Sequence, residues 1–263
     1  MRNGYMLIDA HSHLNKYEEE LESALKQINE HRIFTISTSM DLPSYQRNLE
    51  IADRCNLVLP TFGIHPWNAS EYVDRLEGLR WAINQSPMIG EIGLDHHFVT
   101  DAAQYPTQTK VLEFFLTTAS QQGKIVNLHT KGAEKEVLDL LRRYNIQRAI
   151  IHWYAGPLDI LQAMIEQGLY FTVGVEVFYS SHIQNIAQAL PSERLLTETD
   201  NPGGQKWLTG TGATPLLIRD VVQKLAELRK TTDQAMIETV ESNFTRLIHD
   251  DPWLLDIRNR VFG

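Results

Sequence analysis

Short apolar runs alternate with amphipathic stretches along almost the whole chain, and this alternation restricts the possible folds more than any other feature. Leu21, Leu25 and Ile28, for example, recur at helical spacing among acidic residues, which predicts a helix with one buried face. The apolar runs, which we predict to be strands, cover residues 6–8, 33–38, 57–64, 88–90, 125–128, 149–151, 169–173 and 195–199. Further amphipathic stretches cover about 44–54, 74–84, 107–122, 134–144, 158–167, 183–190 and 215–229. Strict alternation of this kind favours a parallel sheet.

The length and composition are compatible with one large α/β domain. A chain of 263 residues compares with the roughly 200–250 residues that an α/β barrel occupies as a single domain. The sequence contains no linker, internal repeat or low-complexity tract that would divide it. We therefore predict a (β/α)₈ TIM barrel over residues 1–263, in which residues 232–248 form an extra C-terminal helix.

Charge and cysteine content limit the surroundings and the partners of the protein. The net charge of −9 means that a polyanionic substrate must be held by local positive charge rather than by the overall field. The single cysteine, Cys55, cannot form an internal disulfide, and the apolar runs are far shorter than the roughly 18 residues of a membrane span. Residues 1–5 lead directly into a short apolar run, too brief for a signal peptide. We expect a cytoplasmic protein without a membrane partner.

Residues that can bind a metal stand at the ends of most of the apolar runs. In a (β/α)₈ barrel the carboxyl ends of the strands collect the catalytic side chains, so residues distant in sequence can meet there. The residues concerned are His11, His13, His65, Glu91, His129, His152 and Asp200. This set predicts a hydrolase with a two-metal centre.

Each of these residues also has a simpler interpretation when it is taken alone. His11 and His13 point the same way on an extended segment, but a pair of this spacing is weak evidence by itself. His129 and His152 follow runs that look buried, where a lone histidine is more often a hydrogen-bonded core residue. Asp200 precedes Asn-Pro and is compatible with a turn or an N-cap. Their common position at strand ends favours the metal site.

Glu91 has a separate role in the prediction because it lies between small residues, in Gly90-Glu91-Ile92-Gly93. A carboxylate has one oxygen for each of two cations, which an imidazole does not, so we predict that Glu91 bridges two metals. The alternative is a strand-end acid paired with a lysine or arginine. An unpaired charge inside so apolar a run is costly.

These segments together resemble the TatD family of metal-dependent deoxyribonucleases, within the wider amidohydrolase-like barrels, over nearly the whole chain. The matching segments are Asp9-Ala10-His11-Ser12-His13-Leu14, Gly63-Ile64-His65-Pro66, Gly90-Glu91-Ile92-Gly93-Leu94-Asp95, Leu128-His129-Thr130, His152, Glu198-Thr199-Asp200-Asn201-Pro202 and Asn243-Phe244. The resemblance implies a first metal held by His11, His13, Glu91 and Asp200, and a second held by Glu91, His129 and His152. It also implies that His65 faces the substrate phosphate.

The chain departs from the family pattern in several loops near these segments. Lys131 stands where the family usually has an arginine, so the charge is kept but the bidentate grip on phosphate is lost. Segment 153–156 is one residue longer than usual, and 203–207 lacks the proline-rich, arginine-bearing loop of the family. In place of the family's tyrosine, His96 follows Asp95. These departures affect the substrate rather than the metal ligands.

The expected chemistry is hydrolysis of a phosphodiester with the help of two divalent metal ions. Two cations can share a water, lower its pKa toward roughly 7 and clamp the attacking and leaving oxygens. Asp200 would orient that water and act as base, while Lys131 and His65 would neutralise the phosphate oxygens. By ligand type we expect Zn²⁺ or Mn²⁺ (or iron), whereas the family resemblance implies Mg²⁺.

Three functions remain open at this point. The first is a deoxyribonuclease, exonucleolytic on single-stranded or frayed DNA, for which aromatic side chains at 67, 153, 154 and 207 could stack an unpaired nucleotide. The second is a metal-dependent hydrolase of a small ester, lactone or amide, because related barrels share the ligand plan. The third is a non-catalytic scaffold subunit, against which the intact ligand set counts.

Overall fold

The structure, a computed structural model, describes residues 5–262, so that residues 1–4, on which the argument against a signal peptide partly depends, lie outside the described part. The chain separates into two compact units. The first unit contains the residues up to 37, 49–59 and those from 171 onward, and the second contains 38–48 and 60–170. The single domain over 1–263 stays a prediction.

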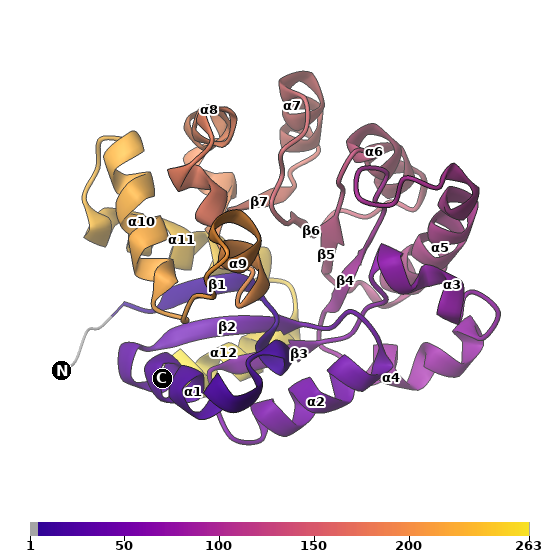
Figure 1. Ribbon diagram of the computed structural model, residues 1–263, viewed down its shortest axis with the longest axis horizontal. Helices are drawn as coiled ribbons and strands as arrows, with labels where there is room; N and C mark the ends of the chain where they lie inside the picture. The colour runs from indigo at the N-terminus through magenta and orange to yellow at the C-terminus, as the bar shows by residue number, and fades with distance from the viewer. Residues whose placement is uncertain (1–4, 263) are drawn as a thin grey trace. The chain divides into compact units, whose positions relative to one another are not determined.

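The eight predicted strands are all present in the described part of the chain, each followed by helical segments (Figure 1). They are β1 Leu7–Ser12, β2 Ile33–Thr38, β3 Val58–Thr61, β4 Ile89–Gly93, β5 Val126–His129, β6 Ala149–Ile151, β7 Tyr170–Val173 and β8 Leu195–Thr197. The pairs β1–β2, β4–β5, β5–β6 and β7–β8 are parallel. The alternation of strands and helices therefore has the predicted order.

The helices agree with the predicted stretches in most places and differ in four. They are α1 Leu21–His31, α2 Leu42–Ala52, α3 Ala69–Tyr72, α4 Arg80–Gln85, α5 Tyr105–Gln122, α6 Glu134–Arg143, α7 Leu158–Glu166, α8 Ser181–Ala189, α9 Gly203–Thr209, α10 Leu217–Leu228, α11 Asp233–Leu247 and α12 Pro252–Phe262. The stretch 74–84 is split by a 3₁₀ turn that contains Gly78. Helices α3, α9 and α12 were not predicted. None of the described helices is long and apolar enough to cross a membrane.

In the first unit, α11 packs against both β1 and β8. The Phe244 ring of α11 lies 5.2 Å from the Phe34 ring of β2, between ring centroids. Strands β1 and β8 are buried along their whole length, as expected for parallel strands covered on two sides. Cys55 is also buried, its Sγ lies 3.5 Å from Asn29 Oδ1, and burial raises the pKa of the thiol.

In the second unit, two glycines of β4 allow a close approach to β5. A Cβ on Gly90 would lie 2.7 Å from the Asn127 Cβ, and a Cβ on Gly93 would lie 1.9 Å from the His129 carbonyl oxygen. Gly93 also has a φ of +152°, which side-chain-bearing residues rarely adopt. The small residues around Glu91 therefore bring the backbones of β4 and β5 together and place Glu91 beside His129.

Candidate metal centre

The second unit gathers three histidines around one carboxylate oxygen. Glu91 Oε1 lies 3.3 Å from His65 Nε2, 3.1 Å from His129 Nδ1 and 3.1 Å from His152 Nε2. All four residues are buried. His129 ends β5, His152 follows β6 and His65 lies in the segment after β3, which agrees with the expectation that strand ends collect the ligands, whereas Glu91 lies inside β4.

The atoms of this cluster fit a divalent metal. His129 Nδ1 lies 3.4 Å from both His65 Nε2 and His152 Nε2, and ligand atoms of His65, Glu91 and His129 all lie within 4.8 Å of one another. Several imidazole nitrogens and an acid oxygen that face one another in a buried place form a mixed nitrogen and oxygen donor set. Such a set suits Zn²⁺ or Mn²⁺ better than an all-oxygen ion.

Asp95 fixes the orientation of His129 from the side away from Glu91. Its Oδ2 lies 3.0 Å from His129 Nε2, and its Oδ1 accepts hydrogen bonds from the backbone N–H groups of His97 (2.9 Å) and Phe98 (2.7 Å). Burial raises the pKa of Asp95, but the hydrogen bond and the charge of His129, with the donors from Phe98 and Trp67, outweigh it and hold the pKa well below its ordinary value. When a metal binds and His129 is neutral, an anionic Asp95 would hold the proton of His129 on Nε2, so that the Nδ1 lone pair would face the cluster.

The sequence did not assign a role to Asp95, although the residue belongs to the segment Gly90 to Asp95 that carries the family resemblance. The sequence does not show which side chain Asp95 contacts, because its partner His129 lies 34 positions further along the chain. The only sequence indication was an acid that follows a strand directly after Gly-Leu.

The first unit gathers the other three predicted ligands. Asp200 Oδ1 lies 3.2 Å from His13 Nε2 and 3.8 Å from His11 Nε2, and the two imidazole rings meet edge-on with centroids 5.2 Å apart. Two backbone hydrogen bonds hold the ends of β1 and β8 together, from Asp200 N to His11 O (2.9 Å) and from His13 N to Asn201 O (2.8 Å). The structure thus brings His11, His13 and Asp200 to one place.

Two buried acids support this group and were not predicted. Glu198 is fully buried, its Oε2 accepts a hydrogen bond from Thr172 Oγ1 at 2.6 Å, and one of its oxygens lies within 4.8 Å of a His11 nitrogen. Asp9 accepts two hydrogen bonds from Thr199, at 2.9 Å from the backbone N and 2.7 Å from Oγ1. Each acid lies two residues before a predicted ligand, His11 or Asp200. The local sequence alone does not distinguish an acid that binds the metal from one that only holds a ligand in position.

Asp9 gives a pH dependence that can be measured on the metal-free protein. Burial raises its pKa to about 8, despite the hydrogen bonds from Thr199, whereas the ordinary value is 3.8. Between these two values the folded protein holds a proton that the unfolded chain has released, so the free energy of unfolding falls as the pH rises. In chelator, we expect this fall between pH 4 and 8 to be shallower in Asp9→Asn, by at most about 1.4 kcal/mol per pH unit. The free energy of unfolding is measured by urea unfolding at each pH, and the same slope against pH in wild type and Asp9→Asn would contradict this expectation. Asp250→Asn, at an exposed position, is the control.

Lys131 contacts one of the four aromatic residues that were expected to stack a nucleotide, and these four differ in exposure. The Lys131 Nζ donates to the Trp153 carbonyl oxygen at 3.2 Å and lies 5.3 Å from the centroid of the Trp153 ring. Trp153 and Tyr154 are 7% and 2% exposed, so the expectation that they stack a nucleotide is wrong. Trp67 and Trp207 are exposed, at 49% and 61%.

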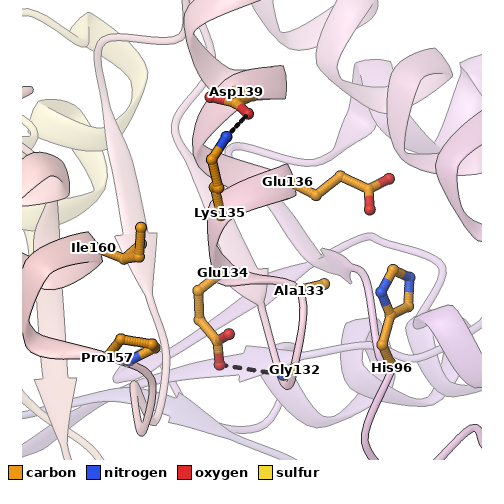
Figure 2. Close-up of a pocket in the computed structure, with 9 residues that line it drawn as sticks. All are labelled: His96, Gly132, Ala133, Glu134, Lys135, Glu136, Asp139, Pro157 and Ile160. Atoms are coloured by element: carbon orange, nitrogen blue, oxygen red, sulfur yellow. Dashed lines mark hydrogen bonds and ion pairs between the residues drawn. The ribbon is translucent and has the colours of Figure 1, made fainter.

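A groove of about 370 Å³ lies at the strand-end loops of the second unit (Figure 2). His96 follows β4, Gly132 follows β5 and Pro157 precedes α7 in its wall. Three carboxylates line the groove, from Glu134, Glu136 and Asp139. Lys135 Nζ pairs with Asp139 Oδ2 at 2.7 Å, and Glu134 Oε1 accepts a hydrogen bond from Gly132 N at 3.1 Å. The excess of acids makes this groove unfavourable for phosphate.

Metal binding should raise the thermal stability of the protein. A ligand that binds only the native state at one hundred times its Kd stabilises it by about 2.7 kcal/mol, which corresponds to a rise in Tm of roughly 5–10 °C for a chain of this size. We expect Zn²⁺ and Mn²⁺ to produce this rise at lower concentration than Mg²⁺. The measurement is thermal unfolding after removal of metal by chelation, with each ion added back.

The matched variants for this measurement are two histidine substitutions. The buried His152→Asn should reduce the rise in Tm, whereas the exposed His249→Asn should leave it unchanged. A rise of the same size in both proteins would show that the ions bind elsewhere.

Eight strands in α/β alternation, with histidines and acids gathered at or near their carboxyl ends, define a protein of the (β/α)₈ fold class with a candidate metal centre. A family model described as TatD related DNase matches residues 8–249. The chain belongs to this family.

Relatives and a solved structure agree with this assignment. A Bacillus subtilis protein named uncharacterized metal-dependent hydrolase YabD is 25% identical over 259 residues, which cover 92% of this chain and 98% of its own. A human protein named deoxyribonuclease TATDN3 is 22% identical over 263 residues, with 93% and 95% covered. The crystal structure of YJJV, a TatD homologue from Escherichia coli, matches with a TM-score of 0.81 at 23% identity and covers 92% of this chain and 97% of its own. This likeness confirms the predicted (β/α)₈ fold class.

Proposed function

We propose that the protein is a metal-dependent hydrolase that cleaves phosphodiester bonds of DNA, from single-stranded or frayed ends. The main observation that supports a metal-dependent hydrolase is that three imidazole nitrogens lie close to Glu91 Oε1 in a buried cluster. The choice of DNA is supported by the family description and by the name of the human relative. The cytoplasmic location stays a prediction.

The residues divide into groups that hold metal and groups that act on the substrate. His129, His152 and Glu91 would hold an ion in the second unit, and His11, His13 and Asp200 would hold an ion in the first. A bound divalent cation would lower the pKa of a water molecule and offset the negative charge that develops on phosphate. That two ions are present and that Glu91 bridges them both remain predictions, which measurement of bound metal per chain tests.

Asp200 is the residue that we assign to accept the proton of the attacking water. Its side chain is 19% exposed, whereas His11 and His13 beside it are 0% and 6% exposed, so water reaches the carboxylate more easily than the imidazoles. The contact with His13 at 3.2 Å orients the carboxylate. His65 and Lys131 would contribute positive or hydrogen-bonding groups to the phosphate oxygens.

Hydrolysis of a small ester, lactone or amide is the second candidate, and the acidic groove favours it. Glu134, Glu136 and Asp139 would repel a nucleic-acid backbone but would accept a substrate with a cationic or hydrogen-donating group. The same metal ligands can serve either reaction. A scaffold without catalysis has no observation in its favour beyond the fold.

The test is digestion of end-labelled single-stranded and duplex DNA with Mg²⁺, Mn²⁺ or Zn²⁺. The wild-type protein should cleave the single strand faster than the blunt duplex, and Asp200→Asn should lose the activity while Asp250→Asn on the surface keeps it. Cleavage that survives Asp200→Asn would indicate a contaminating nuclease. Absence of cleavage with every ion would overturn the DNA assignment, and ester and lactone substrates would then be measured.

A further inference from the structure

Two aromatic side chains in the second unit are exposed next to the histidine cluster, and we call Trp67 and Phe98 the aromatic corner. They are 49% and 42% exposed, and their rings meet at 84° with centroids 6.0 Å apart. They come from different loops, Trp67 from the 3₁₀ turn Pro66–Asn68 and Phe98 from the loop after β4. Large exposed apolar side chains that gather at one place mark a binding surface more often than isolated ones do.

The corner adjoins the candidate ligands directly. The Trp67 ring centroid lies 4.6 Å from that of His65 and 6.4 Å from that of His129. A planar group that stacks on Trp67 would therefore lie within about one nucleotide of the cluster around Glu91, since stacked rings are separated by only a few ångströms.

Hydrogen bonds hold the corner in place although its faces are exposed. The Trp67 indole Nε1–H donates to Asp95 Oδ2 at 2.7 Å, and the Phe98 backbone N–H donates to Asp95 Oδ1 at 2.7 Å. The backbone N–H of Trp67 also donates to His65 Nδ1 at 3.3 Å. A fixed aromatic surface loses little conformational entropy when a ligand binds, which is the property of a prepared subsite.

We infer that the aromatic corner is the subsite for one unpaired nucleobase, that of the nucleotide next to the bond that is cleaved. Two rings at a right angle offer one face for stacking and one edge for a side contact, which is the arrangement that aromatic groups prefer. The corner has no sequence preference built into it, because every base has a π-face. This inference rests on the proposed function and names the part of the substrate that the site recognises.

The first experiment measures binding without cleavage, so it does not depend on the nuclease activity. Fluorescein-labelled pentathymidylate and an abasic pentamer of the same backbone are titrated with metal-free protein in chelator, and anisotropy is recorded. The wild-type protein should bind the pentathymidylate roughly 5- to 150-fold more tightly than the abasic pentamer, as expected from about 1–3 kcal/mol per stacked base. Equal affinity for the two pentamers would overturn the inference.

Two alanine variants and a matched control locate the effect. Trp67→Ala and Phe98→Ala should remove most of the preference for the pentamer that has bases. Trp81→Ala is the control, because Trp81 is 48% exposed on α4 of the same unit, and it should keep the whole preference. A loss of similar size in Trp81→Ala would show that the binding is not specific to the corner.

Trp67→Phe separates stacking from support of Asp95. It keeps an aromatic ring but lacks the N–H that donates to Asp95, so the preference for bases should stay within a few-fold of wild type. A preference as low as in Trp67→Ala would show that the hydrogen bond rather than the ring face matters, and would contradict the subsite. If Trp67→Ala does not fold, Phe98→Ala and Trp67→Phe carry the test.

Cleavage assays with the same variants distinguish the two proposals. If DNA is the substrate, KM should rise about tenfold or more in Trp67→Ala for single strands with a terminal base, but not for strands whose terminal nucleotides are abasic at both ends. If no DNA is cleaved although the wild type prefers the pentamer with bases, the DNA hydrolase proposal fails while the subsite stands. If DNA is cleaved and KM is equal in Trp67→Ala and wild type, the subsite fails while the function stands.

Discussion

Glu91→Gln should lower the rate of metal-dependent hydrolysis by a factor on the order of 10³ or more, comparable to the loss of a group that stabilises transition-state charge. The substitution keeps the shape of the side chain and removes the negative charge that three imidazole nitrogens face at 3.1–3.3 Å. A neutral amide attracts a divalent cation less strongly than a carboxylate does, so the protein should also retain less metal. The measurements are kcat/KM on the best substrate and bound metal per chain by elemental analysis.

The matched control for Glu91→Gln is Glu77→Gln. Glu77 is exposed on the same unit and pairs only locally with Arg80, so its substitution should leave both the rate and the bound metal unchanged. If Glu91→Gln keeps full activity with full metal, Glu91 is not a ligand, and the centre that we describe in the second unit is a structural cluster.

Asp95→Asn should weaken metal binding or activity by about 10- to 100-fold, the usual effect of removing a carboxylate behind a ligand histidine. The amide oxygen of this variant can still accept the hydrogen bonds that the backbone N–H groups of His97 and Phe98 donate. The amide nitrogen, however, is a donor and would face the N–H of His129. His129 would then place its proton on Nδ1, which points toward Glu91.

This effect is checked by metal titration followed by Tm and by kcat/KM at saturating metal, with Asp74→Asn, an exposed acid of the same unit, as the control. High metal concentration should restore part of the Asp95→Asn activity but not that of Glu91→Gln, because Asp95 only orients a ligand. Unchanged metal affinity in Asp95→Asn would show that His129 is held by other contacts.

The sequence was sufficient for the order of elements and for the two groups of candidate ligands. The apolar runs coincide with the strands of the structure. A residue at the end of a run therefore lies at or near the end of a strand. His129 and His152 therefore fall beside Glu91, and His13 falls beside Asp200. Whether these residues bind metal stays a prediction that the variants above test.

What the sequence did not provide were the partnerships between side chains on different strands. Asp95 and Glu198 look like many other acids after a strand, and only the approach of β4 to β5 at Gly93 brings His129 within reach of Asp95. The burial of Trp153 and Tyr154 was missed for a similar reason, because a segment before Gly156 resembles a surface loop. Helix α9 begins at Gly203 and so has a sequence that looked like a turn.

The rate at which the single buried thiol of Cys55 is alkylated reports transient opening of the structure around it. Since the side chain is 3% exposed and the chain has no second cysteine, alkylation can occur only when the region around it in the first unit opens transiently. Mass spectrometry of one labelling event per molecule would therefore time the opening of this unit without an engineered probe. Metal that binds to His11, His13 and Asp200 of the same unit should slow the labelling.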